Sequence, residues 1–232
     1  MRATTTIGLF LIASTWIPAT PLLAQQATPT DADVVDTLPP TIPLFPLQDV
    51  MLFPNISRPF HIFEPRYRAM VSDALNGDRV IGMVLVEPGH DDNFDGTPPI
   101  YAVGCAGVID DVQMFPDGRY NIVLKGLTKF RVLRENLDLA YRVAEVEALP
   151  EVIDEDERAG LRAQRAALSA AFARRVPEAE PPPPELTDED FVNGLAQFLV
   201  LDPSDRQHLL EQDGPLARSL ALLEVMSRDD AR

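Results

Sequence analysis

The chain has 232 residues, of which 46% are hydrophobic, enough for one sizeable core and a smaller helical part. Its 36 acidic residues outnumber 20 basic residues, and the formal net charge is −16. An acidic surface repels phosphate backbones and anionic lipid headgroups, which counts against nucleic-acid and membrane-surface binding. The single cysteine, Cys105, excludes an internal disulfide, so the core alone must hold the fold.

Residues 1–24 have the pattern of a secretory signal peptide. Arg2 supplies a positive end, residues 7–17 form an apolar run, and Ala24 is a small residue at which cleavage can occur. The run is too short to span a bilayer, although retention of this segment as an anchor stays open. We therefore expect an exported protein, periplasmic or secreted. Residues 25–40 are polar and aperiodic, and are predicted to be a disordered leader.

Residues 42–77 change from a strand pattern to a helix pattern. Ile42–Leu47 and Val50–Pro54 are short apolar runs and predict two strands. Their prolines cannot donate to a ladder, which predicts edge or corner positions. Pro65 then opens a helix, which Asn76-Gly77 are expected to close with residues that tolerate positive φ. Its apolar face comprises Tyr67, Met70, Val71, Ala74 and Leu75.

The remaining strands are predicted between residues 80 and 148. Glycines at 104 and 107 suggest a bulge or bend, Pro116-Asp117-Gly118 predicts a hairpin turn, and Gly126 is expected to separate two strands. Six or more short strands with one early helix predict a closed or nearly closed barrel over residues 41–150. The predicted strands are Val80–Val86, Ile100–Val112, Tyr120–Leu124, Thr128–Leu133 and Tyr141–Ala148.

Residues 151–228 are predicted to form a helical subdomain of about four helices. A long helix over Asp154–Val176 comes first, and a proline-rich, stiff spacer over residues 177–186 follows. Thr187-x-x-Asp190 is a helix-capping pattern. The helix that it begins has apolar positions at Phe191, Leu195, Phe198 and Leu199. Asp202-Pro203 starts the next helix. Gly214-Pro215 starts the last helix, whose apolar positions are Leu216, Leu220 and Leu223.

Two sequence blocks resemble the N-terminal, substrate-binding domain of the Lon protease family. The resemblance extends over about residues 41–228 and implies an α+β fold, a PUA-like pseudo-β-barrel with one early helix, followed by a C-terminal helical subdomain. It also implies recognition of unfolded or partly unfolded polypeptide. The matching residues are Pro43–Leu47, Leu52-Phe53-Pro54, His61–Tyr67, Asp117–Tyr120, Lys125-Gly126 and Phe130–Val132.

Asp91-x-Asn93-x-Asp95-Gly96 reproduces the first half of a calcium-binding loop. Ala102 occupies the position at which such a loop needs a bidentate glutamate, and prolines interrupt the remainder. The sequence therefore favours a solvated acidic loop over a calcium site.

Catalytic patterns are incomplete. Asp213-Gly214-Pro215 resembles the run before the nucleophile of Lon-type proteolytic domains, but Leu216 stands where that motif requires serine. The triplet is better explained as a helix stop followed by a helix start. The two lysines, Lys125 and Lys129, lie in the predicted barrel, and the sequence has no phosphate-binding G-x-x-x-x-G-K-[ST] loop.

The remaining candidate side chains also favour structural roles. His61, His90 and His208 lack metal-ligand spacing, and nothing local supports a pair of Cys105 with a histidine. Cys105 lies in an apolar run, where a small buried hydrophobe is usual. For Glu64 and Arg66, helix capping and an ion pair at a strand–helix corner are favoured over direct ligand contact.

The sequence thus predicts a stand-alone, non-catalytic binding module for unfolded polypeptide, an adaptor in exported-protein quality control. A protease or chaperone is the expected partner, with no cofactor and no membrane span after signal removal. No catalytic, cofactor-binding or metal-binding residue is assigned, and the peptide-contacting residues, the client and the oligomeric state stay open. The alternatives are a PUA-like nucleic-acid-binding module and a hydrolase with an unrecognised site.

Overall fold

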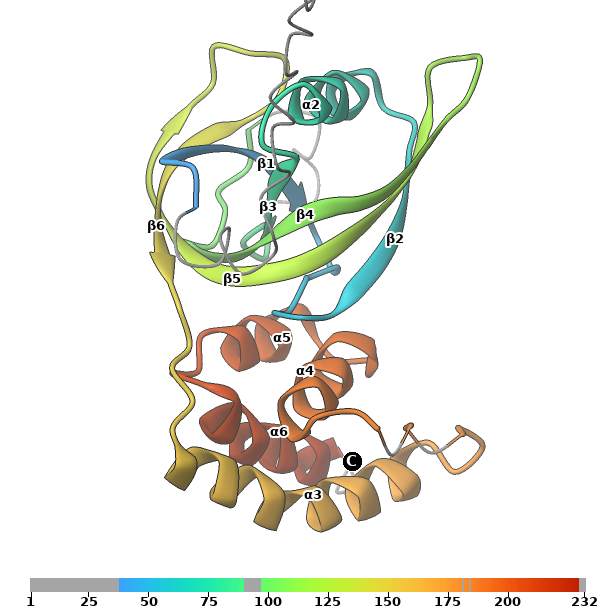
Figure 1. Cartoon of the computed structure of the whole chain (residues 1–232), viewed down its shortest axis with the longest axis vertical. Helices are drawn as coiled ribbons and strands as arrows, with labels where there is room; N and C mark the ends of the chain where they lie inside the picture. Colours follow the sequence, from blue (N-terminus) through green and yellow to red (C-terminus); the bar gives the residue numbers. More distant parts are fainter. Residues whose placement is uncertain (1–37, 90–96, 181, 184, 230–232) are drawn as a thin grey trace, which may run out of the picture.

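A computed structural model describes residues 38–89, 97–180, 182, 183 and 185–229. Over these residues the chain forms six strands followed by helices, with one helix inserted early, which confirms the predicted α+β class (Figure 1). The strands are β1 (Thr41–Leu47), β2 (Ser57–Ile62), β3 (Val80–Leu85), β4 (Val103–Met114), β5 (Tyr120–Asn136) and β6 (Val143–Leu149). The helices are α2 (Pro65–Leu75), α3 (Glu155–Arg175), α4 (Asp188–Phe198), α5 (Pro203–Leu210) and α6 (Pro215–Asp229).

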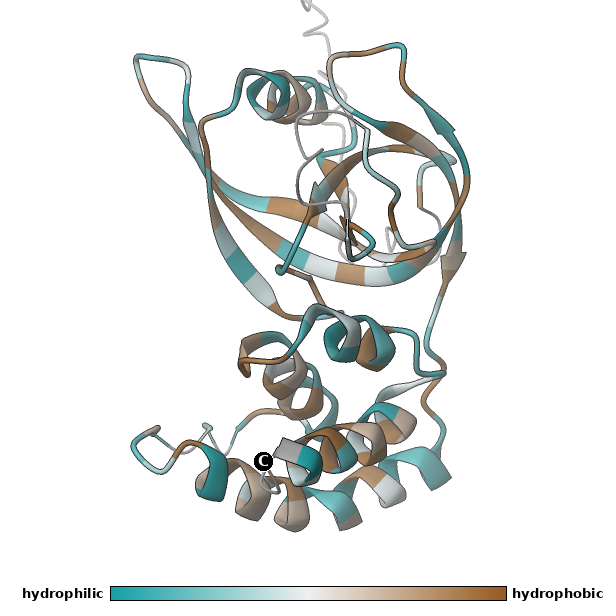
Figure 2. Cartoon of the chain, turned by 180° about the vertical axis from the view of Figure 1, so that it is seen from behind, coloured by the Kyte–Doolittle hydropathy of each residue, from teal (hydrophilic) through white to brown (hydrophobic). Residues whose placement is uncertain are grey.

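The strands form a sheet that closes on itself. Their order is β2-β5-β4-β3-β1-β6, and an additional pairing of β5 with β6 joins the five strands from β5 to β6 into a ring. β1 and β3 are parallel, and the other pairs are antiparallel. Hydrophobic and hydrophilic residues alternate along parts of the strands, as expected when one face of a sheet points inward (Figure 2). α2 covers one end of this barrel, and α3 to α6 lie beyond the other end (Figure 1).

The strand predicted at Ile42–Leu47 is confirmed as β1, but it is not an edge strand; the edge is formed by β2, a strand that was not predicted. β1 lies between β3 and β6, but its two halves pair with different neighbours. Thr41–Pro43 pair with β6, and Leu44–Leu47 pair with β3. Each half of β1 forms ladder hydrogen bonds mainly on one side. Pro43 and Pro46, which lack an N–H, are therefore tolerated in a strand that lies between two others.

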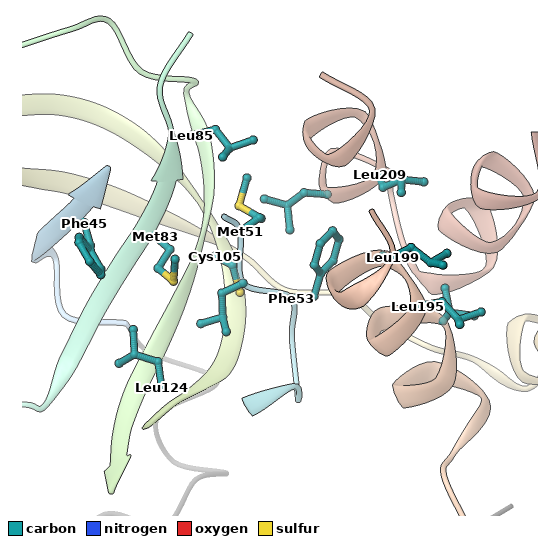
Figure 3. Packing of buried hydrophobic residues seen from close by; sticks show 14 of the residues in the cluster. Phe45, Met51, Phe53, Met83, Leu85, Cys105, Leu124, Leu195, Leu199 and Leu209 are labelled. Atoms are coloured by element: carbon teal, nitrogen blue, oxygen red, sulfur yellow. The ribbon is translucent and has the colours of Figure 1, made fainter. Parts of the chain in front are cut away.

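The strand predicted at Val50–Pro54 is absent, because this segment leaves the sheet and runs between the barrel and the helices. Met51 and Phe53 are fully buried, and the Phe53 N–H donates to Oε1 of Gln197 in α4 (2.9 Å). Figure 3 shows Phe53 between Met51 on the barrel side and Leu199 on the helical side. A short apolar run buried from two sides has the same sequence pattern as a buried strand.

β5 is one continuous strand, so the predicted break at Gly126 is wrong. A side chain at Gly126 would collide with the carbonyl oxygen of Phe53, which crosses directly over the strand. The glycine is needed for this close approach of two backbones and does not interrupt the ladder. The hairpin turn before β5 is confirmed, with Gly118 at φ +82° and a Gly118 N–H to Phe115 carbonyl hydrogen bond of 2.9 Å.

The corner before α2 is held by an ion pair and not by a side-chain cap. Glu64 occupies the N-cap position without a capping hydrogen bond, and its Oε2 lies 2.9 Å from Nη2 of Arg66. At the other end, Asn76 stays right-handed, and Arg79 adopts the left-handed conformation instead (φ 62°). Hydrogen bonds from Nε and Nη2 of Arg79 to the Ile109 carbonyl (3.0 and 2.8 Å) hold that strained residue.

The helices pack on one another and share a hydrophobic core with the barrel. Leu161, Leu168 and Phe172 recur on one face of α3; Leu161 and Leu168 are buried, and Phe172 is partly buried. The face predicted for α6 is displaced: Leu220 is 47% exposed, while Leu222 and Met226 are buried. α6 has apolar residues nearly all round, so its periodicity does not identify the inward side. No helix among the described residues is long and apolar enough to cross a membrane.

Several sequence predictions lie outside the described residues. These are the signal segment 1–24, residues 25–37 of the leader, His90 and the acidic loop that ends at Gly96.

Candidate binding groove

An apolar groove of about 610 Å³ opens where the barrel meets the helices. Its walls come from the loop before β2, the end of α3, the spacer, and α4 with the residues after it. Among the described residues that line it, Asn55, Ser57 and Asp190 are the only polar ones, and none is a histidine, lysine or cysteine. The apolar lining residues are Ile56, Phe172, Val176, Ala179, Pro182, Pro183, Leu186, Phe191, Leu195, Phe198, Leu199 and Val200, together with Gly194.

α4 supplies the floor of the groove. The predicted cap is confirmed, because Oγ1 of Thr187 accepts from the Asp190 N–H (3.0 Å). Phe191 and Leu195 are buried beneath the surface, whereas Phe198 is 62% exposed. Phe198, one of the apolar positions predicted for this helix, therefore presents its ring at the groove. Large exposed apolar side chains gathered in a concave site are typical of a binding surface.

The opposite side of α4 clamps the loop that forms the barrel wall of the groove. Nδ2 of Asn193 donates to the Pro54 carbonyl (3.0 Å), and Nε2 of Gln197 donates to the Ser57 carbonyl (3.4 Å). Oε1 of Gln197 accepts the Phe53 N–H already described. These bonds satisfy main-chain groups that have left the sheet ladder, and they fix the wall relative to the floor.

A buried arginine closes the C-terminal end of α4. The guanidinium of Arg206, in α5, donates to the carbonyls of Ala196 (3.4 Å), Gln197 (2.8 Å) and Leu199 (3.2 Å). Burial lowers the pKa of Arg206. Cations bind the unsatisfied carbonyls at a helix C-terminus favourably, so this contact fixes the chain at the point where Phe198 is displayed.

Beneath α4, an ion network joins the barrel to the helices. Glu151 lies between Lys129 of β5 (Nζ to Oε1, 3.0 Å) and Arg218 of α6 (Nη1 to Oε2, 3.2 Å), and Arg218 also donates to Oδ1 of Asn193 (2.5 Å). Burial alone raises the pKa of Glu151, but the charges and hydrogen bonds of Arg218 and Lys129 outweigh it, and the pKa lies below its ordinary value. Arg218 and Lys129 are buried, so the network ties the two parts at a site shielded from solvent.

The spacer forms the outer wall of the groove, through Ala179, Pro182, Pro183 and Leu186. Its end is fastened to α3 by Arg165, whose Nη1 donates to the Leu186 carbonyl (2.9 Å) and to Oδ1 of Asp188 (2.7 Å). Proline-rich chain is stiff, so this wall can keep its shape without secondary structure.

β2 runs from the groove as the free edge of the sheet. The Gly126 N–H donates to the Ile56 carbonyl (3.0 Å), so alternation turns the main-chain groups of Ser57, Pro59 and His61 away from β5. Pro59 lacks an N–H, and the Ser57 carbonyl is already bonded to Gln197. This edge is therefore poorly suited to adding a strand, and the groove is the better binding feature.

Of the described residues, His61, His208 and Cys105 are not brought together as a reactive set. Nδ1 of His61 lies 2.7 Å from Oδ1 of Asn121 on the exposed surface, and His208 of α5 contacts Gln212 beyond the end of that helix. Cys105 is fully buried, and burial raises the pKa of its thiol, which opposes use as a nucleophile. Over the described residues, no group of three His, Cys, Asp or Glu side chains could hold a metal ion.

The remaining candidates have structural positions. Arg66, paired with Glu64, lines a second cavity of about 70 Å³, too small for a large side chain. Asp213-Gly214 lies between α5 and α6, and Pro215 begins α6, as predicted for a helix stop followed by a start. Lys129 binds Glu151 in the network described above.

The residues that hold the groove were not identified from sequence. Asn193 and Gln197 are polar residues at i and i+4 on an otherwise apolar helix, a pattern that could have indicated a buried polar contact. Glu151 and Arg218 have no such local signal, because they are 67 residues apart, and Arg206 has none because its partners are main-chain carbonyls of the preceding helix end.

Comparisons with known proteins agree on one family. A family model described as the ATP-dependent protease La (LON) substrate-binding domain matches residues 41–228. A Lon protease of Trichlorobacter lovleyi is 29% identical over 218 residues, which are 88% of this chain and 26% of that protein. A Lon protease of Dictyoglomus thermophilum is 27% identical over 215 residues, 82% of this chain and 26% of that protein. The chain thus spans about a quarter of the length of these relatives.

Solved structures give the same result. The crystal structure of a Lon N-terminal domain protein from Xanthomonas campestris has a TM-score of 0.59 and 29% identity, and the match covers 79% of this chain and 97% of that one. The N-terminal domain of a Lon protease of the Mycobacterium avium complex has a TM-score of 0.58, covering 81% of this chain and 98% of that one. At 18% identity, the second likeness shows the fold alone.

Proposed function

Because the chain belongs to the family of ATP-dependent protease La (Lon) substrate-binding domains, we propose that it binds unfolded or partly unfolded polypeptide segments in the groove over α4. One observation carries this proposal. An apolar groove of about 610 Å³ presents Phe198 and Val200, which are 62% and 86% exposed. Folded proteins bury their large apolar side chains, whereas unfolded segments expose them, so such a groove selects the unfolded state.

Burial of apolar area supplies the binding energy. The groove volume accommodates one or two large side chains, and hydrogen bonds to α4 and α3 hold its walls. Ordering a flexible client opposes the gain, so we expect affinity on the order of micromolar. Since apolar contacts dominate, salt should alter the affinity far less than it alters binding to a phosphate backbone.

The domain acts by binding and not by chemistry of its own. The family is that of a substrate-binding domain, which is non-catalytic, and the groove lining pairs no nucleophile with a base. The bound segment would therefore be presented to a protease or chaperone partner.

We place this activity outside the cytoplasm, as an adaptor in exported-protein quality control. The support is the Arg2, apolar-run and Ala24 pattern of residues 1–24. Mass spectrometry of the protein from its native host should find an N-terminus near Gln25. An intact chain that begins at Met1 and stays in the cytosol would contradict export.

The binding proposal is tested by titrating the full chain with a reduced, unfolded protein and, in parallel, with single-stranded RNA, each at low and moderate salt. Phe198→Ala should weaken binding of the unfolded protein several-fold, because it removes the most exposed aromatic ring of the groove. Leu133→Ala is the matched control, since Leu133 is 59% exposed on β5 and does not line the groove.

Saturable binding of the unfolded protein that is weakened by Phe198→Ala and not by Leu133→Ala supports the proposal. Salt-sensitive RNA binding without a response to the unfolded protein would favour the nucleic-acid alternative. Equal effects of the two variants would place the client elsewhere on the surface.

A further inference from the structure

The floor of the groove contains a glycine that packing among the described residues does not require. Gly194 lies in the middle of α4 and lines the groove, as do Asp190 and Phe198, one helical turn away on either side. Among the described residues beyond the α4 backbone and the two adjacent residues, a Cβ atom at Gly194 would lie within 4 Å of one atom, Cδ1 of Ile56 at 3.9 Å. That distance is an ordinary van der Waals contact, and the backbone here is helical, so alanine would fit without strain.

The other glycine within a helix of the described chain, Gly160 of α3, has a clear packing reason. A Cβ atom at Gly160 would lie 2.7 Å from Cδ2 of Leu216, so the Leu216 side chain of α6 would have to move. Glycine inside a helix is destabilising relative to alanine, because it loses more backbone freedom on folding. Close packing of α3 on α6 accounts for that loss of stability at Gly160, whereas no such contact accounts for it at Gly194.

The absent side chain leaves a notch in the groove floor, over the Cα atom of Gly194. Ile56 borders this notch on the barrel side. Phe198, which is 62% exposed, follows one turn later on α4, and the neighbouring Phe191 and Leu195 are buried beneath the surface. The other described residues of α4 that line the groove all carry side chains, so only at the notch can a bound segment pack directly on the α4 backbone.

We infer that Gly194 is a specificity-determining residue, and that its notch receives a large apolar side chain of the bound polypeptide. The inference rests on the proposed function and names its substrate class. Gly194 and Phe198 are four residues apart on α4, a rise of about 6 Å, which two residues of extended chain cover. Side chains at alternate positions of an extended chain point to the same side. A preferred client therefore has large apolar side chains at alternate positions, one in the notch and one against the ring of Phe198.

Gly194→Ala separates this role from a structural one, because it should change stability and binding in opposite directions. Alanine favours the helix, so the melting temperature of the full chain should rise by about 2–4 °C. The added methyl group occupies the notch, so the affinity for a reduced, unfolded protein should fall about tenfold. Gly194→Leu, which fills the notch, should abolish saturable binding. Ser227→Ala is the matched control, because it also places alanine on an exposed helical position, but outside the groove, and should leave the affinity unchanged.

The substrate class is tested with two labelled peptides that share a phenylalanine and differ at one position, two residues away. One peptide has leucine at that position, and the other has alanine. The full wild-type chain should bind the leucine peptide about tenfold more tightly, because leucine buries more apolar area in the notch. Gly194→Ala should reduce that ratio to about one and leave the alanine peptide nearly unaffected, whereas Ser227→Ala should retain the preference for leucine.

The outcomes also separate this inference from the proposed function. A lower melting temperature of Gly194→Ala would show that the fold requires the glycine, and would overturn the inference. A preference for leucine that survives Gly194→Ala would overturn it too. If the wild type binds both peptides equally and Phe198→Ala weakens both, the groove is a polypeptide site that does not select through Gly194. If neither the peptides nor the unfolded protein bind to the wild type, both the proposed function and the inference are wrong.

Discussion

The two sides of α4 differ in how their exposed and polar groups are satisfied. Toward the barrel, Asn193 and Gln197 are buried and hydrogen-bonded to the main chain of the loop at residues 53–57. Toward the spacer, Phe198 is exposed and a carboxylate oxygen of Asp190 has no partner among the described residues. One side is satisfied within the chain, whereas the other presents large apolar side chains to solvent.

This contrast teaches how a small domain can hold an apolar groove open. The groove would collapse if its walls could move together, since that would bury Phe198 and its neighbours. Hydrogen bonds and ion pairs on the barrel side fix the walls at a set distance. Stability and binding should therefore respond to different residues of the same helix.

The largest expected effect is on the ion network. Arg218→Met should lower the free energy of unfolding by about 3–5 kcal/mol, because it leaves Glu151 buried with only Lys129 as a partner. Denaturant unfolding would measure the change. Arg228→Met is the control, since its 2.9 Å pair with Asp205 is exposed and should contribute about 0–1 kcal/mol. Similar losses in both variants would show that the buried network contributes no more to the free energy of unfolding than an exposed ion pair does.

Acid should weaken the same network. The pKa of Glu151 lies below its ordinary value, so the folded state binds this proton less readily than the unfolded state. Its stabilisation is complete above the ordinary pKa and is lost as the pH falls through the lower, folded-state pKa. Melting temperatures measured from neutral pH into the acid range should fall less steeply for Glu151→Gln than for the wild type. Parallel curves would contradict the assignment.

A smaller effect is expected at the clamp. Gln197→Leu keeps the volume of the side chain but leaves the buried Phe53 N–H without its acceptor, at a cost of about 1–3 kcal/mol. Gln113→Leu, on the exposed part of β4, should be nearly neutral by the same unfolding measurement. Binding of an unfolded client should also weaken in Gln197→Leu if the clamp sets the width of the groove.

The smallest effect on stability should come from the groove itself. Phe198→Ala should change the free energy of unfolding by no more than about 0.5 kcal/mol, because the ring is mostly exposed. Phe191→Ala, on the same helix, removes a buried ring and should cost about 3–5 kcal/mol. If thermal or chemical unfolding shows equal losses, Phe198 is part of the core and the two sides of α4 do not differ as described.

Local chemistry in the sequence determined most of the elements. Pro65 with the apolar spacing after it predicted α2, Pro116-Asp117-Gly118 predicted the hairpin, and Thr187 predicted the start of α4. In each case, a few adjacent residues restrict φ and ψ or supply a cap, so the pattern is sufficient without knowledge of the rest of the chain. The family resemblance likewise rested on contiguous residues, and the family match confirms it.

Tertiary structure decided where apolar residues go. Residues 50–54 lie outside the sheet and cross over β5. Gly126 lies inside β5 at this crossing and does not end the strand. Phe198 shares the apolar pattern of α4 with Phe191, yet one ring is exposed and the other is buried. Periodicity states that a residue is apolar and on which side of a helix it lies. Only the elements packed around that helix determine which side is covered, and so which apolar side chains stay open to a ligand.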